Sequence, residues 1–145
     1  MKNILVPFDG SGYSEKAFEK ALEITSKFDS ELTALTVLHA KLEDSSGVSI
    51  QRLGEIQEEQ INEATTMLKN LEEKAKSKNV QLSIKVIHNP SSAEGILSYA
   101  DNNNVDLIVM GSHGRTGLRK IVLGSVASNV VGHAKCPVLI TKATE

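Results

Sequence analysis

The sequence predicts an α/β fold of three layers, in which helices cover both faces of a doubly wound, five-stranded parallel sheet. Short apolar segments alternate with longer segments of helical periodicity, in the order β-α-β-α-β-α-β-α-β. Strict alternation of this kind implies that each helix crosses back over the sheet, so that the strands run parallel. The length of 145 residues suits one hydrophobic core, and we expect a single domain over residues 1–145.

The five strands are predicted from their apolar runs. The first, Ile4-Leu5-Val6, ends at Pro7 and has the form of a strand buried on both faces. The second (residues 32–38) and the fourth (105–110) are rich in aliphatic residues. Residues 82–86 of the third strand alternate between apolar and polar side chains, which favours the edge of a sheet. The fifth strand covers residues 137–141.

Four helices are predicted between these strands from apolar residues at helical spacing. The first covers residues 14–28, and we place Phe28 on its apolar face. The second is long (53–75), with one apolar stripe and other faces crowded with Glu and Lys, which we interpret as solvated. Ser91-Ser92-Ala93-Glu94 fits a capping box before the third helix. The fourth helix covers residues 126–134, and the polar segment 40–49 is predicted to be a loop.

Composition argues against several classes of protein. The net charge of −2 gives no support to nucleic-acid binding, which usually requires a basic surplus. The single cysteine, Cys136, allows neither an internal disulfide nor a cysteine zinc cluster. No apolar run approaches the ~20 residues of a membrane helix, and the first residues do not suit a signal peptide. We therefore expect a cytoplasmic protein with no membrane partner.

The segment after the fourth strand gives the strongest indication of function. An apolar run enters a glycine-rich loop, and Gly124-Ser125 then opens the last helix. Gly111 and Gly114 allow positive φ angles and let backbone N–H groups approach a ligand closely. The unpaired amides of the helix start and the Ser125 hydroxyl would face that ligand. This backbone geometry binds phosphate.

The topology predicts where this site lies. In open parallel sheets, ligands bind at the carboxyl ends of the strands, where the strand order reverses. The segments after strands one and four, residues 7–10 and 111–114, would meet there if the two strands are neighbours. The loop is not a Walker motif, because no G-x-x-x-x-G-K-[ST] occurs. It is also not the G-x-G-x-x-G dinucleotide fingerprint, which would follow the first strand.

Three separated motifs resemble one family and together span essentially the whole chain. Gly111-x₂-Gly114-x₉-Gly124-Ser125 is similar to the signature of ATP-binding members of the universal stress protein family. The opening residues 4–11 and the closing residues 134–140 also resemble that family. The resemblance implies a five-stranded parallel sheet of order 3-2-1-4-5 and a bound ATP, with or without Mg²⁺.

The resemblance also implies site residues, carried over by position. Pro7 and Asp9 match residues that line the adenosine part, and Val37 matches the position whose backbone reads adenine. The other matches form the wall, the ribose–phosphate turn and the phosphate cradle: Met110, Gly111, Gly114, Gly124, Ser125 and Val126.

Basic and ionisable side chains around the loop have less specific roles. His113 suits a pocket wall or a donor to phosphate, and Arg115 could neutralise phosphate charge together with Arg119 and Lys120. For Asp9 we favour contact with ribose over a divalent ion held through water. No His, Cys or carboxylate partners stand at metal-ligand spacing, so no metal site made by protein side chains is predicted.

The last strand predicts self-association. Val138, Leu139 and Ile140 would lie at a sheet edge, and no charge protects that edge from pairing with a second copy. The family resemblance likewise implies a homodimer through this strand. The alternative is that a loop covers it.

Three functions remain open from the sequence. The first is a homodimeric ATP-binding module of the stress response, whose nucleotide sets its interactions with partners. The second is a slow ATPase or nucleotidyl-transferring enzyme that uses the same pocket. No residue is apparent as a base to activate Ser125, so any hydrolysis would be slow. The third is an interaction protein without nucleotide. AMP or a signalling nucleotide would satisfy much the same adenosine contacts as ATP.

Overall fold

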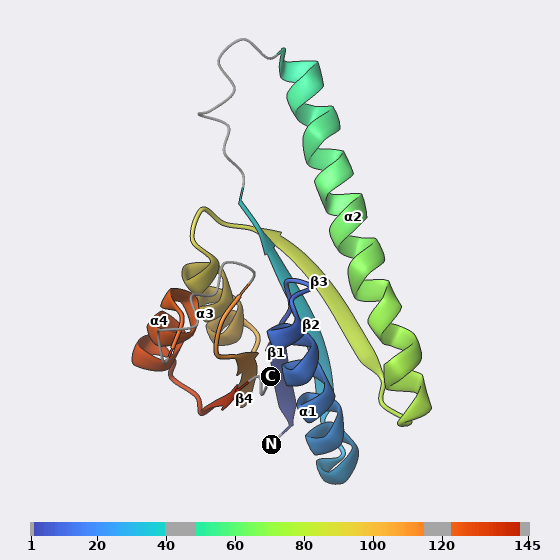
Figure 1. Ribbon diagram of the computed structural model, residues 1–145, viewed down its shortest axis with the longest axis vertical. Helices are drawn as coiled ribbons and strands as arrows, with labels where there is room; N and C mark the ends of the chain where they lie inside the picture. Colours follow the sequence, from blue (N-terminus) through green and yellow to red (C-terminus); the bar gives the residue numbers. More distant parts are fainter. Residues whose placement is uncertain (1, 40–48, 115–122, 143–145) are drawn as a thin grey trace.

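The computed structural model describes residues 2–39, 49–114 and 123–142, and it confirms the predicted fold (Figure 1). A five-stranded, all-parallel sheet has the order β3-β2-β1-β4-β5. The strands are β1 (Asn3–Pro7), β2 (Glu31–Leu38), β3 (Leu82–His88), β4 (Leu107–Gly111) and β5 (Val138–Thr141). The helices are α1 (Gly12–Phe28), α2 (Ile50–Ser77), α3 (Ser92–Asn102) and α4 (Ser125–His133).

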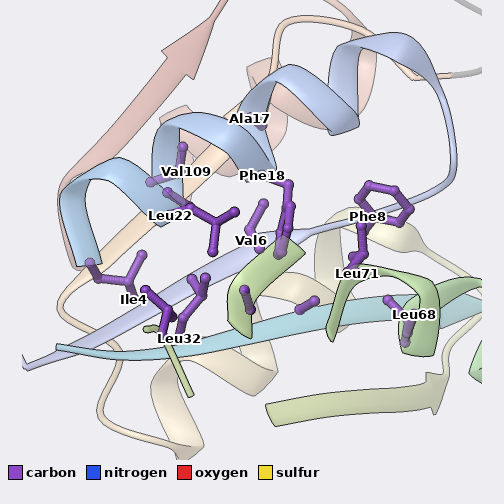
Figure 2. Close-up of a cluster of buried hydrophobic side chains, with 14 of the residues drawn as sticks. Ile4, Val6, Phe8, Ala17, Phe18, Leu22, Leu32, Leu68, Leu71 and Val109 are labelled. Carbon is purple, nitrogen blue, oxygen red and sulfur yellow. The ribbon is translucent and has the colours of Figure 1, made fainter. Parts of the chain in front are cut away.

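The sheet divides the core into two hydrophobic clusters, one on each face. Helices α1 and α2 cover one face, where Phe18, Leu68 and Val6 pack together (Figure 2). Helices α3 and α4 cover the other face, where Ile96 and Val130 belong to the second cluster. Successive β1 side chains point to opposite faces, so Ile4 and Val6 join the first cluster and Leu5 joins the second. The prediction that β1 is buried on both faces is confirmed.

Strand β3 lies at the sheet edge, as its alternating pattern predicted. Its burial alternates between half-buried and exposed side chains along residues 82–86. Strand β5 forms the opposite edge. Leu139 in that strand is 37% exposed, whereas Val138 and Ile140 pack against the second cluster.

Local hydrogen bonds explain where α1 begins. The Ser11 side chain caps the helix by accepting from the amide of Ser14. The Asp9 carboxylate in turn accepts from the amide of Ser11, over 2.9 Å between Oδ1 and N. A side chain that accepts from the first-turn amides is the usual reason for a helix to start at a serine. The predicted turn after β1 therefore also caps α1, and it fixes Asp9 beside the end of β1.

The capping box predicted for α3 forms only in part. Ser91 is the cap residue and its hydroxyl accepts from the amide of Glu94. The reciprocal bond of a capping box would run from the Ser91 amide to the Glu94 side chain. That amide instead donates to the side-chain oxygen of Asn89, over 2.9 Å. The loop between β3 and α3 is therefore closed by Asn89.

Two apolar residues lie farther from the core than periodicity predicted. Phe28, placed on the buried face of the first helix, is 59% exposed at the end of α1. In α2, Ile61 is 37% exposed, whereas Leu68 and Leu71 are buried. Ile61 lies in the N-terminal half of α2, and in Figure 1 this half extends past the ends of the strands that the other half covers. Helical periodicity gives the direction in which a side chain points, but not whether the sheet reaches that far.

Asp106 ties the first strand to the loop before β4. Its Oδ2 atom accepts from the amides of Lys2 and Asn3, each over 2.9 Å, and its own amide donates to the Asn3 carbonyl. The bond from the Asn3 amide, followed by that from Lys2, holds the pKa of the Asp106 carboxyl below its usual value. Hydrogen bonds to the charged form lower a carboxyl pKa in this way. The start of β1 is thus held by a carboxylate.

We expect Asp106→Asn to lower the melting temperature at neutral pH and to make no difference in acid. A carboxyl with a depressed folded pKa stabilises the fold above its unfolded pKa of about 3.9. That stabilisation is lost as the pH falls through the lower folded value. Thermal melts of both proteins from neutral pH down to about pH 2 would check this. Asp101→Asn is the control, because that exposed carboxylate has only an ion pair at 3.6 Å with Lys135 in the described structure. A gap between Asp106→Asn and the wild type that does not change with pH would contradict the prediction.

Candidate functional site

A pocket of about 370 Å³ lies at the carboxyl ends of the central strands. It arises because β1 ends earlier than β2. Pro7 pairs with Leu35, and β2 then continues to Leu38. The chain beyond β1 stays fastened to β2, since the Phe8 amide donates to the Leu35 carbonyl over 2.8 Å. Strand β4 flanks β1 on its other side, so the predicted neighbourhood of strands one and four is confirmed.

The structure brings the sequence-predicted residues together around this one pocket. All nine of the proposed nucleotide contacts line it: Pro7, Asp9, Val37, Met110, Gly111, Gly114, Gly124, Ser125 and Val126. His113 lines it as well. Arg115, like Arg119 and Lys120, lies outside the described residues. The pocket therefore draws on the carboxyl ends of β1, β2 and β4 and the residues just after β1 and β4, together with the start of α4.

Residues that sequence reasoning missed also line the pocket. They are Phe8, Ser14, Leu35, Thr36, Ser92, Ile96 and Ala127. Most are apolar or already bonded within the protein; the Thr36 hydroxyl, for example, donates to the Phe8 carbonyl over 2.8 Å. Strand topology offered the available signal, because it places the segments next to Pro7 and Val37 at the same edge of the sheet.

The backbone of Val37 faces the pocket side of β2. The Leu35 carbonyl accepts from Phe8 on the β1 side, and the Leu38 carbonyl accepts from Asn89 on the β3 side. Backbone groups alternate between the two sides along a strand. The N–H and C=O of Val37 therefore point to the side on which β1 has ended. One donor and one acceptor are thus presented to the pocket by one residue.

The two loop glycines are needed for close approach and not for an unusual backbone angle. Glycine allows positive φ angles at positions 111 and 114, but neither residue adopts one. Among the described residues, Gly10 is the glycine with a positive φ angle, at 85°. A Cβ atom at Gly111 would lie 2.7 Å from the Tyr13 Cβ atom and 2.9 Å from its carbonyl carbon. Gly111 therefore lets α1 pack directly on β4.

Gly114 keeps space beside a carboxylate. A Cβ atom there would lie 2.9 Å from the Asp9 Oδ2 atom. Because the other oxygen of Asp9 is held by the Ser11 amide, this carboxylate has little freedom to move away. Any side chain at position 114 would therefore press on Asp9 at the rim of the pocket.

Helix α4 begins at the pocket without a side-chain cap. Gly124 is the cap residue, with φ of −67° and ψ of 165°, and as a glycine it has no side chain to accept from the first-turn amides. The Gly124 amide donates to the Ser112 carbonyl over 2.7 Å, and the first helical bond runs from the Ser128 amide to the Gly124 carbonyl. Amides of the first turn have no partner within a helix. Ser125 is the first helical residue, and its side chain is exposed.

The partial positive charge at this helix start would favour an anion. Helix dipoles and unpaired first-turn amides together bind phosphate and carboxylate groups. The three residues of the first turn, Ser125, Val126 and Ala127, all line the pocket. The same pocket therefore has an apolar wall, backbone groups of Val37 at one end and an anion-binding helix start at the other.

His113 is held between a serine and an aromatic ring. Its Nδ1 atom lies 2.9 Å from the Ser112 hydroxyl oxygen, and Ser112 is buried. The His113 ring packs against the Tyr13 ring, with centroids 5.2 Å apart and planes tilted by 48°. These contacts hold the imidazole at the wall near Gly124, whose Cβ position would be 3.5 Å from the ring.

A second serine–histidine contact lies at the opposite end of the pocket. The His39 Nε2 atom is 3.1 Å from the Ser92 hydroxyl oxygen. Its Nδ1 atom is 3.2 Å from the backbone carbonyl oxygen of Asn89. His39 directly follows β2, and Ser92 begins α3 after the neighbouring strand β3. No residue pattern predicted a contact between residues this far apart in the chain.

Comparison with known proteins identifies the family. The model of the universal stress protein family matches residues 1–142. This chain belongs to that family. Universal stress protein MJ0531 of Methanocaldococcus jannaschii is 35% identical over 143 residues, which cover 97% of this chain and 82% of the relative. Universal stress protein YxiE of Bacillus subtilis is also 35% identical, over 96% of this chain and 97% of the relative.

A solved structure agrees with the fold of this universal stress protein. Hypothetical protein MJ0577 is 29% identical and superimposes with a TM-score of 0.85, over 99% of this chain and 97% of that one. Within the described residues, no group of three or more His, Cys, Asp or Glu side chains could hold a metal ion. The described helices include none that is long and apolar enough to cross a membrane.

Proposed function

We propose that this universal stress protein binds ATP, or a closely related adenine nucleotide, and acts as a nucleotide-dependent module of the stress response. The observation that carries this proposal is the start of α4, where a glycine is the cap residue and the first-turn residues line the same pocket as Val37. Within the one domain proposed for residues 1–145, this gives a phosphate site and a base site in one cavity. The proposed place of action is the cytoplasm.

The phosphate end is formed by the glycine loop and α4. Ser125 and Val126 would hold phosphate oxygens through their amides, and Gly124 lets the helix start lie close to Ser112. His113 is placed to donate to a phosphate from the wall. Nucleoside triphosphates usually bind with Mg²⁺, which prefers the phosphates and one or two carboxylates as ligands. Among the described residues, Asp9 supplies the carboxylate that lines this pocket. It would contact either a ribose hydroxyl or the hydrated ion.

The base end suits adenine. The N–H and C=O of Val37 form a donor–acceptor pair, which is what the N1 and 6-amino groups of adenine require. Leu35, Ile96 and Met110 supply apolar surface for the faces of the ring. A mostly apolar cavity with a few convergent polar groups is the usual form of a cofactor site.

Other universal stress proteins of this fold have been solved with adenine nucleotides. One, 21% identical to this chain, was determined in complex with cAMP. Another, from Archaeoglobus fulgidus and 19% identical, was determined in complex with dAMP. At this level of identity the likeness to these two structures is one of fold. The support for binding in the present protein comes from its own pocket.

We further propose that two copies associate through β5. This strand is a sheet edge, and Val138, Leu139 and Ile140 carry no charge that would prevent pairing with another strand. Leu139 is 37% exposed on it, and Val131 of the preceding helix is 48% exposed. Pairing of the two edges would continue the sheet from one copy to the other.

Native mass spectrometry tests both parts of the proposal. We expect the mass of a dimer, and a mass increment of one adenine nucleotide per chain after ATP and Mg²⁺ are added. At a ligand concentration of about 100 times the Kd, ATP should stabilise the fold by about 2.7 kcal/mol. Thermal melts with and without nucleotide measure this effect, and CTP serves as the control ligand. Neither a mass increment nor a thermal shift with any adenine nucleotide would favour an interaction protein without nucleotide. Release of inorganic phosphate would favour the slow ATPase.

A further inference from the structure

The end of the pocket near β3 carries a polar contact that the adenine site of the preceding proposal does not use. Ser92 lines the pocket on the same helix as Ile96, and α3 packs tightly on Val37. The tightness appears at Gly95, where a Cβ atom would lie 2.9 Å from the Val37 Cγ1 atom. The Ser92 side chain is therefore close to the residue whose backbone faces the base.

With a neutral imidazole, the contacts of His39 fix the direction of the hydrogen bond to Ser92. The Asn89 carbonyl oxygen can only accept, so a neutral imidazole must carry its proton on Nδ1 to bond with it. The Nε2 atom then has no proton and can only accept. It lies 3.1 Å from the Ser92 oxygen, so the Ser92 hydroxyl must donate to it. The Ser92 hydroxyl has no second proton, so its oxygen can only accept a further hydrogen bond.

The frame around this pair is fixed. The Asn89 amide donates to the Leu38 carbonyl, and the Asn89 side-chain oxygen accepts from the Ser91 amide. Ser91 in turn caps α3. The carbonyl that sets the imidazole tautomer and the helix that bears Ser92 are thus tied to the same short loop. A polar group held in this way keeps its donor or acceptor character without the entropy cost of reorientation.

We propose that His39 makes Ser92 an obligate hydrogen-bond acceptor, which selects a 6-amino purine over a 6-oxo purine. This inference rests on the proposed function, because it assigns a specificity role within the same site. The exocyclic amino group of adenine donates a hydrogen bond, whereas the 6-oxo group of hypoxanthine or guanine only accepts. Two acceptors that face each other leave both without a partner, and unpaired polar groups in a site discriminate strongly between ligands.

Titration calorimetry with ATP and ITP tests this inference, since ITP has a 6-oxo group and a proton on N1 where ATP has a 6-amino group and an unprotonated N1. The N1 difference concerns the Val37 backbone, which is the same in the wild type and in variants at positions 92 and 39. We expect the wild type to bind ATP more tightly than ITP. In Ser92→Ala the ratio of the two affinities should fall about tenfold, mainly through weaker ATP binding, which corresponds to about 1.4 kcal/mol. His39→Leu should reduce the ratio by a similar factor. Without the His39 acceptor, the Ser92 hydroxyl can rotate and donate to the 6-oxo group of ITP.

The control and the alternative outcomes separate this inference from the proposed function. Ser98→Ala, on the exposed side of the same helix, should keep the wild-type ratio. Equal losses for ATP and ITP in Ser92→Ala and His39→Leu would indicate a structural role and would overturn the inference. An unchanged ratio in both variants would overturn it as well, with ATP binding itself intact. Failure of the wild type to bind either nucleotide would overturn both the inference and the proposed function.

Discussion

Ser125→Asp is expected to weaken ATP binding by at least about 100-fold, while the protein without nucleotide becomes slightly more stable. Ser125 is the first residue of α4, and it lines the pocket at the proposed phosphate end. A carboxylate there would face the polyphosphate within a few ångströms, where like charges repel by about 4 kcal/mol at the effective dielectric constant of a protein surface. The same carboxylate interacts favourably with the helix dipole, by about 0.3–1 kcal/mol.

The opposite signs of the two effects make this variant informative. Binding is measured by calorimetry, and stability by thermal melts of the protein free of nucleotide. Ser128→Asp is the matched control, because it places the same charge on an exposed position of the same helix that does not line the pocket. We expect nearly unchanged binding in the control. Equal affinity for ATP in Ser125→Asp and the wild type would show that the phosphates do not bind at the start of α4.

Gly111→Ala is expected to destabilise the protein by about 2 kcal/mol or more. The added Cβ atom would lie 2.7 Å from the Tyr13 Cβ atom and 2.9 Å from the Tyr13 carbonyl carbon and oxygen. Part of that obstacle is the backbone of α1, so no side-chain rotation relieves it, and the helix must move away from β4. Overpacking of a core usually costs about 1–3 kcal/mol. Urea titration measures the change in the free energy of unfolding. An unchanged m value, the slope of that free energy against urea concentration, checks that unfolding stays two-state.

Gly132→Ala provides the control for Gly111→Ala. Gly132 lies in α4, and a Cβ atom there would meet nothing within 4 Å. Alanine in an open helical position should stabilise the helix by up to about 1 kcal/mol relative to glycine. The same substitution is thus expected to have opposite signs at two glycines. A loss in Gly111→Ala no greater than 0.5 kcal/mol, roughly the size of a surface substitution, would contradict the close packing of α1 on β4.

The layout of the fold could be predicted from the sequence because buried parallel strands and amphipathic helices leave clear local patterns. Runs such as Ile4-Leu5-Val6 are apolar on both faces since helices cover both, and the structure buries all three residues. The pattern gave no information on how far the hydrophobic core reaches along each helix. Phe28 has the correct helical phase, but it is the last residue of α1 and is exposed, and the phase alone does not say where the core ends.

The candidate site could be predicted where a residue acts through its own local geometry. The glycine loop and the start of α4 are contiguous in sequence, and the structure places them at one pocket. Contacts between distant segments could not be predicted. The reason for Gly111 is Tyr13, almost a hundred residues away, and His39 meets Ser92 only because β2 and β3 are neighbours. Such pairings depend on strand order and register, which residue patterns do not encode.

The pocket has a consequence for the order in which the protein is made. Its wall begins with Pro7 and ends with Ala127, and the sheet beside it is closed only by residues 138–141. A ribosome synthesises these segments from the first to the last, so a ligand has no complete cavity to enter until the start of α4 and then β5 have emerged. Occupancy of the pocket would therefore distinguish chains that contain all of these segments from shorter ones that lack them.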